Sequence, residues 1–203
     1  MNSLRIKILA YDGVEALDYA GPFEVFTTAA RMQKRLQAQA QPWCEVQCVA
    51  LCATPVTARA GLRLLPDRTF TDFDARGTDV LLIPGGVVDE AMQNDPTLQW
   101  IAMESARSGI TASVCTGAFL LAASGVVTRE SVTTHWEDVD DLRRQFPQLK
   151  VETDVRWVDN GAIVTSAGIS AGIDMSLHLV ARLGGMALAE RTARQMDFAW
   201  TKN

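Results

Sequence analysis

Short apolar segments alternate along this chain with longer segments in which apolar positions recur every three or four residues. The short segments predict strands at about 5–10, 44–51, 80–83 and 110–114. The longer segments predict helices that begin near Pro22, at Asp95-Pro96 and near Ala171. Such alternation is typical of an α/β fold, in which helices cover both faces of a mostly parallel sheet.

Glycine and capping residues mark where several elements should end. Two pairs of short segments, 56–57 with 62–65 and 155–158 with 162–165, are separated by glycine-containing turns and predict hairpins. Gly109 is expected to close the second helix, and Thr134-His135-Trp136-Glu137 has the spacing of a capping box before another helix. The last helical segment is expected to break at Gly184-Gly185 and to run on toward Trp200.

The composition predicts one globular domain over residues 1–203. Of the 203 residues, 48% are hydrophobic and 21% are charged, which is ordinary for a chain that buries a core. The formal net charge of -5 argues against nucleic acid as a partner, because phosphate binding needs a basic face. The longest apolar run has about six residues, whereas a membrane helix needs roughly 20, and residues 4–8 alternate like a strand rather than a signal peptide. We therefore expect a cytoplasmic protein with no membrane partner.

Three of the four cysteines, Cys44, Cys48 and Cys52, have a regular spacing that suggests a metal site. The segment reads as a strand, on which residues four apart are separated by about 13 Å. A single metal ion, which holds thiolates at about 2.3 Å, cannot span that distance. We expect these cysteines to be small strand residues on one face, and we expect no metal.

Cys115 lies at a junction between an apolar strand and a helix rich in small residues. A cysteine at such a turn directs its sulfur away from the backbone, near the positive end of a helix dipole that favours the thiolate. Because the thiolate is the form that attacks carbon, Cys115 is the candidate nucleophile. The alternative is a small core residue, which is the usual place of an unpaired cysteine.

Ligand sites in parallel sheets lie at the carboxyl ends of the strands, and several unusual residues are expected there. Backbone N–H groups of Thr116 and Gly117 could form half of an oxyanion hole, or simply begin a helix. Gly85-Gly86 could supply the other half, since glycine lets the backbone approach a ligand, or could belong to a phosphate loop. Asp18 is either a turn residue before the helix or an acid whose pKa is raised by burial and by a nearby thiolate, so that it can donate a proton to the substrate.

Only two histidines occur. His135 could be a structural residue of a first helical turn, or it could orient or protonate a group near Cys115, and the sequence leaves both interpretations open. His178 lies four residues after Asp174 and four before Arg182, a spacing that predicts a solvated polar stripe on a helix.

Five separated motifs together resemble the ThiJ/PfpI superfamily. They are Leu17-Asp18-Tyr19-Ala20-Gly21-Pro22, Ile83-Pro84-Gly85-Gly86, Ser113-Val114-Cys115-Thr116-Gly117, Thr133-Thr134-His135-Trp136 and Ala171-Gly172-Ile173-Asp174. The motifs are most similar to the isonitrile (isocyanide) hydratase branch, and also resemble the amidotransferase-like domain of AraC-type regulators. The resemblance implies a flavodoxin-like fold related to class I glutamine amidotransferase domains, and a homodimer.

The resemblance also implies roles for individual residues. Cys115 matches the nucleophile, Asp18 matches the hydratase acid, and Thr116 matches the hydratase threonine where PfpI-type peptidases have histidine. Gly168 and Ile169 fall in the stretch that lines the hydratase pocket, although this chain departs there from the glycine-rich pattern. The implied reaction is cofactor-independent hydration of a small-molecule isocyanide to an N-substituted formamide through a Cys115 thioimidate.

Two other functions fit the same residues. One is a non-catalytic sensing or regulatory module, in which Cys115 binds a ligand or is oxidised without turnover. The other is a cysteine-dependent amidase or deglycase-like enzyme, which would need acid–base chemistry from His135.

Overall fold

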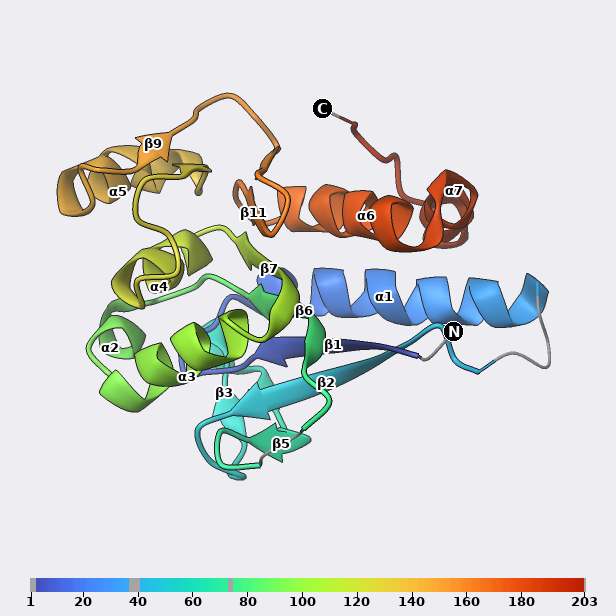
Figure 1. Cartoon of the computed structure of the whole chain (residues 1–203), viewed down its shortest axis with the longest axis horizontal. Helices are drawn as coiled ribbons and strands as arrows, with labels where there is room; N and C mark the ends of the chain where they lie inside the picture. The colour runs from blue at the N-terminus through green and yellow to red at the C-terminus, as the bar shows by residue number, and fades with distance from the viewer. Residues whose placement is uncertain (1–2, 37–40, 73–74, 203) are drawn as a thin grey trace.

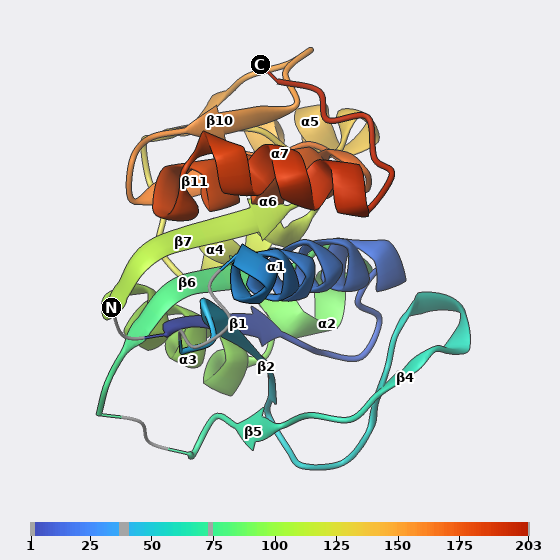
Figure 2. The same ribbon diagram turned by 90° about the vertical axis from the view of Figure 1, so that its right-hand side faces the viewer.

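A seven-stranded sheet forms the centre of the molecule. The structure is a computed structural model that describes residues 3–36, 41–72 and 75–202. In spatial order the sheet contains β10 (Trp157–Asp159), β11 (Ile163–Ser166), β7 (Ser108–Val114), β6 (Thr78–Ile83), β1 (Leu4–Leu9), β2 (Cys44–Ala50) and β5 (Arg68–Thr69), as Figure 2 shows. Every pairing is parallel except that of β10 with β11.

The order of the main parallel strands confirms the flavodoxin-like prediction. The five main parallel strands are, in chain order, β1, β2, β6, β7 and β11. In space they lie in the order β2, β1, β6, β7, β11, which is 2-1-3-4-5 when they are numbered along the chain. This is the flavodoxin-like arrangement, in which the direction of winding reverses between β1 and the strand beside it. The reversal therefore falls between β1 and β6, and their carboxyl ends are where a ligand site is expected.

Helices cover both faces of the sheet. On one face α1 (Ala16–Leu36), α6 (Ala171–Gly184) and α7 (Met186–Gln195) pack against one another, and Figure 1 shows α1 and α6 side by side. On the other face lie α2 (Asp89–Met92), α3 (Asp95–Ser105) and α4 (Gly117–Ala123). The strands between these layers are buried on both sides, with Ile6, Ile8 and Leu82 fully buried on one side and Leu81 and Ile83 on the other.

The shorter elements lie around this core. Both predicted hairpins are confirmed, one by β3 (Val56–Thr57) with β4 (Arg63–Leu64) and the other by β10 with β11. The remaining elements are η1 (Arg59–Gly61), β8 (Ser131–Val132), η2 (Trp136–Asp138), α5 (Val139–Gln145) and β9 (Lys150–Val151).

Three predicted helix boundaries are wrong. Pro22 lies inside α1, which begins at Ala16, and its missing N–H leaves the Asp18 carbonyl without the usual bond from four residues on. Gly109 does not close a helix but lies in β7, where a Cβ atom would approach the Asp79 carbonyl oxygen at 3.0 Å. The last helix ends at Gln195, well before Trp200.

Two predictions of exposure also fail. Asp174 is fully buried rather than part of a solvated stripe, because it is paired with Arg156. Cys52 lies beyond the end of β2 and is exposed, whereas Cys44 and Cys48 are buried in the strand as expected. Within residues 3–36, 41–72 and 75–202, no helix is long and apolar enough to cross a membrane.

Candidate active site

Three segments that are far apart in the sequence meet at the carboxyl ends of β1, β6 and β7. Asp18 lies in the first turn of α1, Gly85 follows β6, and Cys115 follows β7. Because β7, β6 and β1 are neighbours in the sheet, their ends place these residues together at the reversal point. The structure thus places Asp18 beside Cys115, although the two residues are nearly a hundred positions apart in the chain.

Cys115 has a strained backbone that several neighbours hold in place. Its φ is 55°, a left-handed value that is uncommon for a residue with a Cβ atom. Its N–H donates to the Ser166 carbonyl oxygen at 3.1 Å, and its own carbonyl oxygen accepts the Thr134 hydroxyl at 2.9 Å. With a relative exposure of 7%, the residue is buried at a sharp turn between β7 and α4.

Two backbone amides point at the Cys115 sulfur. The N–H groups of Thr116 and Ile169 both hydrogen-bond to it. Ile169 also has a left-handed φ, of 44°, which is an outlier for a β-branched residue. Negative charge that develops on the sulfur therefore finds two donors, one from each side of the turn.

The Asp18 carboxyl is fully buried beside the sulfur. Burial, together with the smaller effect of the charge of Glu15, raises its pKa from an ordinary 3.8 to about 7. Hydrogen bonds from the Gly85 N–H, at 3.1 Å to Oδ2, and from the Cys115 thiol oppose this rise. Among the described residues, Oδ1 has no hydrogen-bond partner. The carboxyl can therefore exchange a proton near neutral pH.

Desolvation of the sulfur opposes the thiolate that the helix dipole is expected to favour. Burial raises the pKa of Cys115 to about 12, and the negative charge of Asp18 adds to this effect. The N–H groups of Thr116 and Ile169 only partly offset it. The helix that follows has just seven residues, so its dipole is outweighed by desolvation and by a carboxylate in contact.

The two glycines after β6 brace the site instead of offering free donors. The Gly85 N–H binds Asp18, and the Gly86 N–H donates to Thr116 Oγ1 at 2.8 Å. The predicted use of Gly85-Gly86 as a second oxyanion donor or as a phosphate loop therefore does not fit this structure. A Cβ atom on Gly85 would lie 2.5 Å from the Thr116 nitrogen, so glycine is needed here for close approach.

Gly117 has a packing role at the start of α4. A Cβ atom there would lie 2.2 Å from the Ile83 carbonyl oxygen, so the absence of a side chain lets the helix begin directly on the end of β6. The amides that reach the sulfur are those of Thr116 and Ile169, and the former was predicted.

His135 caps a short helix rather than joining the sulfur. Its Nδ1 accepts the Glu137 N–H at 3.4 Å and lies 3.5 Å from Asp138 Oδ2. The predicted capping box from Thr134 is wrong, because the Thr134 hydroxyl binds Cys115 instead. Among the interactions given for the described residues, none joins the His135 ring to the Cys115 sulfur. Its ring packs against Gly168, where a Cβ atom would lie 1.9 Å from Cδ2.

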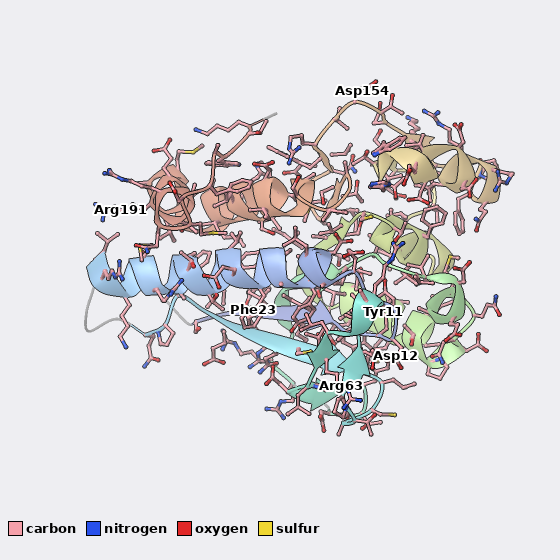
Figure 3. The ribbon with its side chains drawn as sticks, turned by 180° about the vertical axis from the view of Figure 1, so that it is seen from behind. Tyr11, Asp12, Phe23, Arg63, Asp154 and Arg191 are labelled. Carbon is pink, nitrogen blue, oxygen red and sulfur yellow. The ribbon has the colours of Figure 1, made fainter. Side chains whose placement is uncertain are left out.

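A cleft of about 720 Å³ is lined by residues that contact Cys115, although neither Cys115 nor Asp18 is among its lining residues. Its wall includes Ile169, whose amide reaches the sulfur, and Trp136, whose relative exposure is 76%. Figure 3 shows Asp154, another lining residue, on the loop beyond β9. The other lining residues include Thr133, Thr134, His135, Val139, Val155 and Gly168.

Several residues of the site were not predicted. Tyr11 is buried beyond the end of β1, its hydroxyl donates to the Pro84 carbonyl oxygen at 3.1 Å, and its pKa is raised by burial and by the charges of Asp18 and Cys115. Figure 3 shows Tyr11 close to the β3–β4 hairpin. Glu15 and Tyr11 follow the first predicted strand so closely that their position at a strand end could have identified them.

The cysteines of β2 have structural surroundings. Cys44 Sγ donates to the Phe26 carbonyl oxygen at 3.3 Å, and burial raises the pKa of both Cys44 and Cys48. In the part of the chain that the structure describes, no group of three or more His, Cys, Asp or Glu side chains could hold a metal ion.

Comparison with known proteins agrees with this geometry. Isonitrile hydratase of Pseudomonas putida is 33% identical over 198 residues, which are 97% of this chain and 79% of that protein. The crystal structure of a ThiJ/PfpI family protein from Pseudomonas syringae superposes with a TM-score of 0.84 at 30% identity, over 100% of this chain and 78% of the other.

Regulators are also similar. The HTH-type transcriptional regulator GbdR of Pseudomonas aeruginosa is 25% identical over 202 residues, and this chain spans 53% of its length. The profile of the DJ-1/PfpI family matches residues 4–182. This chain, with its cysteine on a strained turn between a strand and a helix, is a member of the DJ-1/PfpI family.

Proposed function

We propose that this protein hydrates isocyanides to N-substituted formamides. The observation that carries the proposal is the contact between a buried Cys115 thiol and an Asp18 carboxyl whose pKa is about 7. A second support is the 33% identity to isonitrile hydratase of Pseudomonas putida along nearly the whole chain. A cofactor is not needed, because this reaction requires only a nucleophile, water and a group that moves protons.

In the first half of the reaction, the sulfur of Cys115 attacks the terminal carbon of R–N≡C. The Asp18 carboxylate takes the thiol proton as the S–C bond forms, and then delivers it to the same carbon. The product is the thioimidate R–N=CH–S–Cys115. The N–H groups of Thr116 and Ile169 stabilise negative charge on the sulfur while the proton is on Asp18.

In the second half, water adds to the thioimidate carbon. Asp18, again ionised, takes one proton from the water and passes it to the substrate nitrogen, which gives the adduct R–NH–CH(OH)–S–Cys115. The Asp18 carboxylate then takes the hydroxyl proton as the C–S bond breaks, the carbon keeps the oxygen as a formyl group, and Asp18 returns that proton to the sulfur. The sum is R–N≡C plus water giving R–NH–CHO, and the enzyme is unchanged.

The test is to incubate the purified protein with several isocyanides and to follow the formamide by NMR. We expect turnover by the wild type and none by Cys115→Ala, whereas Cys52→Ser, which changes an exposed thiol, should retain it. No turnover with any isocyanide would reject the activity, and full turnover by Cys115→Ala would reject the mechanism.

A second candidate function is that of a sensing or regulatory module. It is supported by the similarity of the whole chain to part of GbdR, a transcriptional regulator. It predicts that a small molecule binds near Cys115 without being converted. Isothermal titration with isocyanides and their formamides, beside the turnover assay, separates the two functions.

We also propose that residues 1–203 act as a single domain in the cytoplasm and assemble as a homodimer. Family resemblance supports the dimer, and the acidic composition supports the absence of nucleic acid among its partners. Sedimentation equilibrium tests the dimer directly.

A further inference from the structure

Asp174 is a fully buried carboxylate in the first turn of α6 that the proposed reaction does not use. It forms an ion pair with Arg156, and its Oδ1 accepts the Thr201 N–H at 2.8 Å. The Trp200 indole N–H donates to its carbonyl oxygen at 3.2 Å. Charged side chains are seldom buried without a compensating role, and a buried pair is weak evidence for stability alone.

Arg156 connects this carboxylate to the loop that faces Cys115. Its carbonyl oxygen accepts the Ala167 N–H at 2.9 Å, and its guanidinium contacts Ser170 Oγ at 3.5 Å as well as Asp174. Arg156 therefore binds the segment 167–170 near both ends. The residue between these two contacts that touches the site is Ile169.

Ile169 needs such support. Its φ of 44° is an unfavourable conformation for a β-branched residue, and such backbones persist only where surrounding contacts hold them. The loop lies against the cysteine, since the Cys115 N–H approaches the carbonyl oxygens of Ser166 at 3.1 Å and Ala167 at 3.3 Å. In this position the Ile169 N–H acts on the Cys115 sulfur and favours its thiolate. If the loop relaxed, the amide would turn away from the sulfur.

We propose that the Arg156–Asp174 pair is a positioning device that holds the Ile169 amide against the Cys115 sulfur. The effect on the thiol follows from contacts alone, whereas the effect on turnover rests on the proposed function. The charges that act most on Asp18 and on the sulfur do not include Arg156 or Asp174, so the pair acts through the loop. The same contacts include Thr201, so the chain after α7 closes over the pair.

A matched control lies close by on the same helix. Asp159 of β10 accepts hydrogen bonds from Arg182 at 3.0 Å and pairs with His178 at 2.6 Å, both on α6. This second cluster joins β10 to α6, whereas the Arg156–Asp174 pair joins the residue before β10 to α6. The contacts of Asp159 are with α6 and its own turn, and not with the described segment 167–170. Asp159→Asn therefore reports the cost of weakening the packing of α6 without disturbing the loop.

The experiment compares Asp174→Asn, the double variant Asp174→Asn/Arg156→Gln and Asp159→Asn in a Cys52→Ser background. The asparagine keeps an acceptor for the Thr201 N–H, and the double variant leaves no unpaired charge, so it should remain folded. The first readout is the rate of Cys115 alkylation by iodoacetamide from pH 6 to 10, with the site verified by peptide mass spectrometry. The second is kcat and KM with an isocyanide, and thermal unfolding verifies the fold.

The groups that influence the Cys115 sulfur are Asp18 from α1, Asp138 from η2, and the amides of Thr116 and Ile169. The variants change only the last of these. Since that amide favours the thiolate, its loss should raise the pKa of Cys115 and slow alkylation several-fold at each pH. We expect kcat to fall about tenfold to a hundredfold, with a smaller change in KM.

Asp159→Asn should match the Cys52→Ser parent in both readouts. The proposal is overturned if the folded double variant alkylates at the parent rate, or if Asp159→Asn slows alkylation equally. Because alkylation needs no turnover, a protein that hydrates no isocyanide still tests the device. Failure of the proposed function is thus distinguishable from failure of this proposal.

Discussion

The Thr116 hydroxyl binds the backbone of Gly86 in both directions. It accepts the Gly86 N–H at 2.8 Å and donates to the Gly86 carbonyl oxygen at 2.9 Å. The amide of Thr116 also acts on the Cys115 sulfur. Gly85, the residue before Gly86, supplies the amide that binds Asp18. One side chain therefore connects the turn that carries the nucleophile to the turn that holds the acid.

Thr116→Val should loosen this connection. It keeps the shape but removes the partner of the half-buried N–H and carbonyl of Gly86, at a cost of about 1 kcal/mol in unfolding free energy. We expect kcat to fall by about tenfold, because Asp18 loses part of its orientation. Thr116→Ser keeps the hydroxyl and should lose little unfolding free energy and little kcat. Urea unfolding measures the first quantity and steady-state kinetics the second. If the valine and serine variants behave equally, the Thr116 hydroxyl does not connect the two turns.

The proposed mechanism gives a definite pH dependence. Asp18 must be ionised to take the thiol proton, and its pKa is raised to about 7 by burial. The value of kcat/KM should therefore rise with pH, show an inflection near 7, and level off above it. Glu15 contributes to that raised pKa, so Glu15→Gln should move the inflection to lower pH. A profile without an inflection between pH 5.5 and 8.5 would argue against Asp18 as the base.

The same buried acid should destabilise the folded state at high pH. The folded pKa is about 7, while an unfolded aspartate titrates near 3.9, so the folded protein binds more protons between these values. Stability is therefore fully present below about pH 4 and is lost as the pH rises through 7. The difference of about 3 in pKa corresponds to an upper bound of about 4 kcal/mol.

Asp18→Asn tests this trade-off. The variant should be inactive, yet at pH 8 it should be more stable than the wild type by up to about 4 kcal/mol. At pH 4 the two should be nearly equal, since both then carry a neutral side chain. Chemical denaturation at the two pH values measures the difference. An Asp18→Asn protein that is less stable at pH 8 would show that the charged carboxylate is well solvated or paired.

Local patterns predicted the core of this fold. The apolar segments that became β6 and β7 are recognisable because each ends in a run of buried residues, 80–83 and 110–114, so the signal lies in consecutive residues. Residues 4–8 of β1 are recognisable instead by their alternation. The strand–helix junction at Cys115 is equally local. For this reason the sequence identified the nucleophile's turn and the acid after the first strand.

Partners that are distant in the chain were not predictable in the same way. The spacing of Asp174 is that of a polar helix stripe, and only the fold brings Arg156 and Thr201 to it. Thr134 has a capping sequence, but the Cys115 carbonyl oxygen competes successfully for its hydroxyl. The raised pKa of Cys115 likewise follows from burial and from Asp18, neither of which is visible in the residues that flank the cysteine.

His135 separates the hydratase from an amidase or deglycase-like enzyme. The ring caps η2 and packs on Gly168, and its contacts are with Glu137 and Asp138. We expect His135→Ala to change kcat by less than about tenfold, since general acid–base catalysis contributes typically 10²–10⁴-fold where it operates. A loss of a hundredfold or more in the isocyanide assay would assign the histidine a direct role and favour the other chemistry.

Oxidation offers a last test of the thiol state. Peroxide reacts with the thiolate, and the pKa of Cys115 is raised to about 12 by burial, while Cys52 is exposed. Mild peroxide at pH 7 should therefore oxidise Cys52 before Cys115. Because the charge of Asp18 adds to the raised pKa, Asp18→Asn should speed oxidation of Cys115. Peptide mass spectrometry over time distinguishes the sites, and rapid oxidation of Cys115 in the wild type would instead support the sensing function.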